Sequence, residues 1–158
     1  MTIRKAEKRD IPKLLDLLSQ VLEIHAKLRP DIFVSGSTKY TSCELEQMID
    51  TESTMIFDAT DSQDSVIGYA FCKLRNPSPS NNQKSFKSIM IDDLCVDESA
   101  RGQHVGEELF EFVKAEAKRL GCYEIMLTVW EGNDPAKAFY DKMGMRSEEH
   151  TLNSSHQV

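Results

Sequence analysis

A short glycine-bearing segment, RGQHVG at residues 101–106, stands directly before an amphipathic stretch of helical periodicity. The first turn of a helix leaves backbone N–H groups unpaired, and the helix dipole adds positive potential there. Gly102 and Gly106 let the backbone approach a ligand closely, and Arg101 adds a positive charge that suits phosphate. The segment therefore predicts a diphosphate site, although an ordinary helix start with a solvated arginine has the same pattern.

Two adjacent carboxylates interrupt the apolar segment KSIMIDDLCV. Side chains of a strand alternate between its two faces. The apolar residues Ile89 and Ile91 have odd numbers, whereas the apolar residues Leu94 and Val96 have even numbers, so the alternation shifts by one residue at Asp92–Asp93. A slip of one residue indicates a β-bulge, which is frequent beside active sites. A strand buried on both faces is the alternative, and the central carboxylates favour the bulge.

Periodicity and turn residues predict the elements of the N-terminal half. Asp10 is expected to cap a first helix, and Pro12 lies in its first turn. A long exposed loop is expected after an antiparallel strand pair. The expected order is a strand at Thr2–Ala6, a helix ending near Lys27, a helix at Ser42–Asp50, and strands at Thr54–Ala59 and Val66–Leu74.

The C-terminal half alternates strands with helices. The strand ending at Val96 precedes a helix near residues 103–121, the buried strand CYEIMLTV, and a helix capped by Asp134 and ended by Gly144. Strand, helix and strand at this spacing imply a parallel crossover within a mixed sheet. A chain of 158 residues suits one α/β domain.

The composition limits the partners. With a formal net charge of −7, the chain has no general basic surface, so we expect no nucleic-acid partner. Cationic small molecules or basic peptide ends suit an acidic surface. The four cysteines are widely spaced without a C-x-x-C pair, which favours a reduced cytoplasm. Neither a signal-peptide core nor a run of roughly 20 apolar residues is found, so we expect no membrane partner, and a homodimer stays open.

Two segments together carry a family resemblance. RGQHVG preceded by DDLCV, and EGNDPAKAFYDKMG after one helix and one strand, resemble the acetyl-coenzyme A binding core of the GNAT family of N-acetyltransferases. The similarity covers roughly residues 1–144 in element order, and its specific part is Ile89–Gly144. IDDLCV and AFYDKMG look similar to the small-amine group that includes diamine and polyamine acetyltransferases. The resemblance implies a mostly antiparallel central sheet flanked by helices, a bulged strand and a βαβ coenzyme-binding core.

Carried over by position, the resemblance implies acetyl-CoA as co-substrate, without a metal, and three groups of coenzyme contacts. Backbone groups would meet the pantetheine amides at Leu94, Cys95 and Val96. The pyrophosphate would lie in the loop made by Arg101, Gly102, Gln103, His104, Val105, Gly106 and Glu107. The coenzyme arm would be lined by Asn133, Ala136 and Phe139.

His104 departs from the family pattern, which most often has glycine at this position. A side chain there occupies space near the phosphates, and a positive φ is uncommon for a residue with a Cβ. We interpret the imidazole as tolerated and turned to solvent. The alternative is that it donates a hydrogen bond to a phosphate oxygen.

The resemblance also implies the catalytic groups. It places Tyr140 at the thioester sulfur, where a phenol can protonate the leaving thiolate; without the resemblance, a core aromatic beside Phe139 is the simpler interpretation. Asp92 is the expected base, directly or through water. Asp93 competes, because the phase slip leaves open which carboxylate faces the cleft, and both could instead bind a cationic substrate. We interpret His25, near the acceptor site of the family, as a surface residue.

The predicted function is direct transfer of an acetyl group from acetyl-CoA to the primary amine of a small molecule. A protein or peptide N-acetyltransferase is the second interpretation, because it would use the same catalytic core with a more open acceptor cleft. A non-catalytic acyl-CoA sensor is the third. A nucleotide-binding module would need more βαβ units than this chain supplies.

The tail after Gly144 lacks the composition of a buried strand. RSEEHTLNSSHQV has Leu152 and Val158 as its only aliphatic residues, so we expect the final strand of the fold to be missing or replaced. The run also resembles the conceptual translation of a sequencing-library adapter. Our hypothesis is a single N-acetyltransferase domain at residues 1–145 and a non-native polar tail at 146–158.

Overall fold

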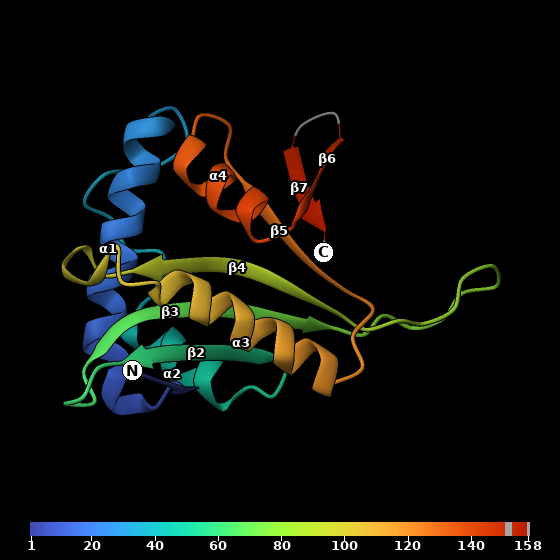
Figure 1. Ribbon diagram of the computed structural model, residues 1–158, viewed down its shortest axis with the longest axis horizontal. Helices are drawn as coiled ribbons and strands as arrows, with labels where there is room; N and C mark the ends of the chain where they lie inside the picture. Colours follow the sequence, from blue (N-terminus) through green and yellow to red (C-terminus); the bar gives the residue numbers. More distant parts are fainter. Residues whose placement is uncertain (151–152, 158) are drawn as a thin grey trace.

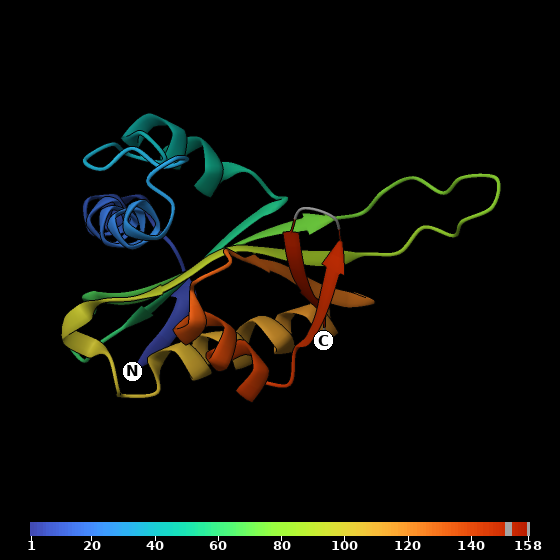
Figure 2. The same ribbon diagram turned by 90° about the horizontal axis from the view of Figure 1, so that it is seen from above.

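The computed structural model describes residues 1–150 and 153–157, and its elements form a sheet between two layers of helices (Figure 1, Figure 2). The strands are β1 (Thr2–Lys5), β2 (Thr54–Thr60), β3 (Val66–Arg75), β4 (Ser88–Val96), β5 (Glu124–Val129), β6 (Arg146–His150) and β7 (Asn153–Gln157). The helices are α1 (Ile11–Leu28), α2 (Ser42–Asp50), α3 (Val105–Arg119) and α4 (Asp134–Lys142), with 3-10 turns η1 (Lys8–Asp10) and η2 (Glu98–Ala100).

The sheet is mixed and mostly antiparallel, as predicted. Its strand order is β1-β2-β3-β4-β5-β7-β6, and β4 with β5 is its parallel pair among the described strands. The helix α3 connects these two strands and packs against β2, β3, β4 and β5, which confirms the predicted crossover. The long loop predicted after β3 projects beyond the rest of the fold (Figure 1, Figure 2).

Each face of the sheet has its own apolar core. The helices α1 and α2 cover one face, where Leu14, Leu17 and Leu45 pack on Tyr69 and Phe71 (Figure 2). The other face lies under α3 and α4. Its fully buried side chains include Ile89, Leu109, Phe110 and Val113. Side chains of a strand alternate between faces, and the change of phase within β4 leaves Leu94 and Val96 in the same core as Ile89 and Ile91, while Cys95 enters the other core.

The predicted bulge in β4 is confirmed. Phe71 lies opposite Asp93 and its neighbour Cys72 lies opposite Ile91, so Asp92 is the extra residue. The parallel ladder between β4 and β5 ends at Ile91 and Leu127. Beyond the bulge the two strands separate, and this separation opens the sheet.

The tail, where the final strand was expected to be missing or replaced, forms two strands. Residues 146–150 and 153–157 form an antiparallel pair, and β7 also pairs with β5 from Met126 to Val129. Backbone N–H and C=O groups make these ladders, so a polar sequence can complete a sheet edge without aliphatic side chains. The final strand is therefore present, and the non-native origin of the tail stays a hypothesis.

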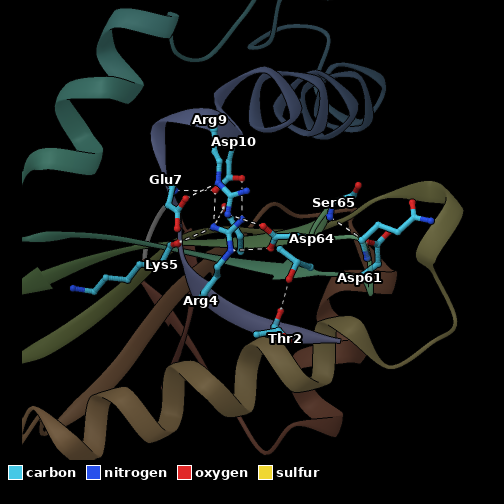
Figure 3. A network of polar contacts seen from close by, with 12 residues as sticks. Thr2, Arg4, Lys5, Glu7, Arg9, Asp10, Asp61, Asp64 and Ser65 are labelled. Carbon is cyan, nitrogen blue, oxygen red and sulfur yellow. Dashed lines mark hydrogen bonds and ion pairs between the residues drawn. The ribbon is translucent and has the colours of Figure 1, made fainter.

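A polar network joins β1 to the start of α1 (Figure 3). Arg4 donates to both carboxylate oxygens of Asp10, at 2.7 and 3.0 Å, and its Nε donates to Asp64 at 3.2 Å. Asp10 lies at the predicted N-cap position of α1, yet its side chain makes no capping bond to that helix. It accepts instead from the Glu7 N–H at 2.8 Å, because Arg4 holds it toward the preceding 3-10 turn.

In the part of the chain that the structure describes, no helix has the length and apolar character needed to span a membrane.

Candidate active site

The separation of β4 and β5 opens onto a cavity of about 920 Å³. It lies between α1 with its following loop, the C-terminal half of β4, the start of α3, the end of β5, and α4. The predicted site residues that line it are Asp92, Leu94, Cys95, Val96, Arg101, Gly106, Asn133, Ala136, Phe139 and Tyr140. One cavity thus brings together residues from three separate parts of the chain.

The remaining predicted residues lie outside the lining. Gly102, Gln103 and His104 are exposed in the loop before α3. The Val105 side chain is only 2% exposed in the core under α3, so only its backbone could meet a ligand. Glu107 turns aside, because its carboxylate pairs with Lys142 at 2.6 Å and with the ring of His104 at 3.2 Å.

The loop before α3 has a tight left-handed geometry. Gly102 has φ +79° and His104, at the N-cap of α3, has φ 63°. Residue 104 is the family's glycine position, and the chain adopts the left-handed conformation there with an imidazole in place. A Cβ on Gly106 would meet Phe139 at 3.5 Å and Val96 at 3.6 Å, so α3 begins in close contact with α4 and β4.

Tyr140 lies at the inner end of the cavity and is 8% exposed. Its ring packs edge-on against Phe139, with centroids 5.0 Å apart, and against Phe110 at 6.0 Å. Burial raises the pKa of the Tyr140 phenol, with a further contribution from the charge of Asp93. The phenol is therefore protonated at neutral pH and can act as a proton donor.

The two adjacent carboxylates of the bulge differ in environment although both line the cavity. Asp92 forms an ion pair with Lys73 at 3.2 Å. Asp93 accepts a hydrogen bond from the Tyr69 hydroxyl at 2.9 Å, and burial raises its pKa. A bulge places two successive side chains on one side of a strand, which is why parity alone left the choice open.

Sequence reasoning missed the acceptor side of this cavity. His25 lines it, and burial lowers the pKa of its ring, so the imidazole is neutral at neutral pH. Phe33 packs on His25 with ring centroids 5.2 Å apart, and Trp130 packs edge-on against Phe33 at 5.3 Å. The available signal was the apolar segment IFV within the otherwise polar loop PDIFVSGSTK.

No group of three or more His, Cys, Asp or Glu side chains that could hold a metal ion occurs within the described part of the chain. Among the described residues, the ionisable side chains that line the cavity are one phenol, two carboxylates, one imidazole, the thiol of Cys95, and the cationic groups of Lys39 and Arg101.

The family model of the acetyltransferase (GNAT) family matches residues 18–145, which contain the whole cavity lining. The chain belongs to the GNAT acetyltransferase family. It is an acetyltransferase with the fold that the sequence resemblance implied, and the family's donor is acetyl-CoA.

Known proteins support this assignment. The structure of a mutant of the BH1408 protein from Bacillus halodurans is 32% identical, covers 96% of this chain and 97% of that one, and gives a TM-score of 0.90. The PaiA N-acetyltransferase from Thermoplasma acidophilum, solved with coenzyme A, shares the fold at 18% identity, with a TM-score of 0.78 over 99% of this chain and 96% of that one.

One further relative matches over a shorter part of the chain. Glucosamine 6-phosphate N-acetyltransferase from Arabidopsis thaliana is 37% identical over 59 residues. The match spans 37% of this chain and 38% of that enzyme.

Proposed function

We propose that this GNAT acetyltransferase moves an acetyl group from acetyl-CoA directly to the primary amine of a small molecule. The observation that carries the proposal is the single cavity, which joins the start of α3 to a buried phenol and to the carboxylates of the bulge. Donor and acceptor could therefore meet without a covalent enzyme intermediate, which favours direct transfer.

The cavity walls fit the coenzyme. On its β5 side, the described part of β4 has no strand partner after Ile91, so backbone groups near Leu94, Cys95 and Val96 are available to amide groups of a ligand. The start of α3 offers N–H groups for phosphate, and Arg101 is exposed beside it. We assign the pyrophosphate to residues 101–107 and the coenzyme arm to Asn133, Ala136 and Phe139.

When bound, the coenzyme supplies an activated acetyl thioester. We assign Tyr140 to protonate the departing sulfur, because its raised pKa keeps the proton in place and its ring is fixed by Phe139 and Phe110. The phenol then recovers its proton from solvent or from the attacking nitrogen before the next turnover.

The acceptor ammonium must lose a proton before it attacks. Asp92 was the predicted base, and Asp93 is the better candidate on two grounds: Asp92 is engaged by Lys73, and the Tyr69 hydroxyl orients Asp93. The raised pKa of Asp93 also brings it nearer to that of an amine proton. The neutral imidazole of His25 can relay the proton onward.

Thiol release from acetyl-CoA against a panel of amines tests the proposal, with the acetylated product identified by mass. The panel includes putrescine and spermidine, because the resemblance to diamine and polyamine enzymes is still a prediction, and basic peptides as the second acceptor class. Turnover of small amines supports the proposal. Turnover of peptides alone would reassign the acceptor, and coenzyme binding with no thiol release would remove the catalytic assignment.

A further inference from the structure

The outer end of the cavity carries an unusual concentration of exposed apolar side chains. Six large hydrophobic side chains are exposed among the described residues, and three of them line this cavity: Ile24 at 39%, Ile32 at 46% and Val34 at 70%. Apolar side chains gathered on one concave surface indicate a place where an apolar group binds.

A row of rings continues this apolar surface inward. His25, Phe33 and Trp130 follow one another with centroid separations of 5.2 and 5.3 Å. The Arg29 guanidinium lies 5.7 Å from the Trp130 ring centroid, and its own charge is paired with Asp31 at 2.8 Å. The row therefore offers ring faces and edges to a ligand, with the nearby cation already neutralised.

The loop that carries these residues is attached to α1. The Glu23 carboxylate accepts from the Ser35 hydroxyl at 2.7 Å and from the Gly36 N–H at 2.8 Å. These bonds hold the segment 32–34 over the C-terminal half of α1. A surface held in position before binding loses less conformational entropy when a ligand arrives.

The charges at the inner end match a single ammonium group. Asp93 is the carboxylate without a bound lysine, since Asp92 pairs with Lys73 at 3.2 Å. Lys39 also lines this end, and its charge opposes the rise in the pKa of Asp93. A second ammonium would meet Lys39 rather than a second free carboxylate, and one lysine is a weak site for a phosphate dianion.

We propose that the acceptor is a monoamine with an apolar, preferably aromatic, body. Its amine lies at Asp93, and its body packs against Ile32, Val34 and the ring row. This inference rests on the proposed function and names the substrate class of the same site. Polyamines and sugar phosphates are then poor acceptors, because the described cavity lining has no carboxylate besides Asp92 and Asp93, Asp31 beside the ring row is paired with Arg29, and no cationic cluster lines the outer end.

Binding can be measured without turnover, because Trp130 is the only tryptophan of the chain. We expect 2-phenylethylamine, which absorbs little where indole is excited, to change Trp130 emission with a Kd at least tenfold below that of methylamine. We also expect kcat/KM to be higher for 2-phenylethylamine than for methylamine, and at least tenfold higher for 2-phenylethylamine than for spermidine. A hydrophobic subsite discriminates by about this factor for each methylene that it buries.

Surface variants locate the subsite. Val34→Ser and Ile32→Ser remove apolar area from exposed positions, so the fold is preserved while the ratio of kcat/KM for 2-phenylethylamine to kcat/KM for methylamine falls at least fivefold. Phe86→Ser, at an exposed residue of the β3–β4 loop that is 44% exposed and outside the cavity, is the matched control and should not change this ratio.

The outcomes separate this inference from the proposed function. Equal or better turnover of spermidine, or variants without effect, overturns the monoamine inference and leaves amine acetylation standing. Trp130-detected binding of 2-phenylethylamine without thiol release sustains the apolar subsite and overturns the acetylation proposal. If Val34→Ser changes the oligomeric state by sedimentation but not the amine preference, a second copy of the chain covers this surface and the inference is wrong.

Discussion

Asp58 in β2 is buried with 0% exposure, and its carboxyl group lies beside that of Asp10. Its Oδ2 lies 4.0 Å from Nη1 of Arg4. Burial, together with the nearby carboxylate of Asp10, raises the pKa of Asp58 to about 9. Although burial opposes it, the hydrogen bonds from Arg4 lower the pKa of Asp10 to about 2. One carboxyl of the pair is therefore ionised and the other is neutral at pH 7.

The sign of the pH effect follows from these two values. Asp58 has an ordinary pKa of 3.8 in the unfolded chain, so between that pH and about 9 the folded state holds one more proton. Its contribution to stability is complete below pH 3.8 and is lost as the pH rises toward 9. The slope is about 1.4 kcal/mol per pH unit, hence on the order of 4 kcal/mol between pH 5 and pH 8. Asp10 adds no slope there, because it is ionised in both states.

The replacement Asp58→Asn keeps the volume and removes the titration. We expect the free energy of unfolding of the variant, relative to the parent, to rise by about 1.4 kcal/mol per pH unit from pH 5 to pH 8. Urea denaturation at three pH values measures this difference, in which the other titrating groups cancel. Asp64→Asn is the control, because this exposed carboxylate has a lowered pKa and gives no slope above pH 5. A flat difference for Asp58→Asn would show that Asp58 is ionised in the fold.

Three further predictions concern the site. Tyr140→Phe should lower kcat about 10²-fold with the Kd for acetyl-CoA nearly unchanged, because the ring still packs; normal turnover would exclude the phenol as the acid. Asp93→Asn should flatten the acidic limb of the pH–rate profile, whereas Asp92→Asn should change KM more than kcat. If Asp92→Asn flattens the limb and Asp93→Asn changes KM, then Asp92 is the base. His104→Gly should stabilise the fold by up to about 1 kcal/mol in thermal or urea unfolding, since glycine adopts φ 63° without strain, and should keep or improve coenzyme affinity. Gln103→Gly, at a neighbouring position without positive φ, should give no such gain, and a tenfold loss of affinity in His104→Gly would show that the imidazole contacts the ligand.

The bulge could be predicted because it changes the alternation of apolar residues within a single strand. Ile89 and Ile91 have the opposite parity to Leu94 and Val96, yet all four pack in the core under α3 and α4, so one residue between them must be extra. The helix Ser42–Asp50 was predicted with the bounds that the structure has, whereas the predicted cap Asp134 is wrong, because the Asn133 side chain caps α4 by accepting from the Ala136 N–H. In these cases the information lies within a few residues of the chain.

The acceptor side could not be predicted in the same way. Lys73, a residue of the neighbouring strand, decides which of the two carboxylates of the bulge is held in an ion pair. The loop after α1 has no periodic pattern from which its structure could be predicted. Nothing in TMIFDAT marks Asp58 as lying beside Asp10, because that pairing is set by the contact of β1 with β2. The strand pairing of the tail was not predicted, because side-chain composition says little about backbone pairing at a sheet edge.

The bulge in β4 has a consequence for how such an enzyme can vary. The opening between β4 and β5 exists because one strand carries one residue more than its partner, so it depends on residue count rather than on residue type. Substitutions along the outer loop can therefore exchange one acceptor for another while the entrance is kept. Removing the single residue Asp92 would instead restore the regular alternation of the strand, with Asp93 to Val96 on the faces that they already occupy, and would remove the irregularity at which β4 and β5 separate, so the entrance would close to every acceptor at once.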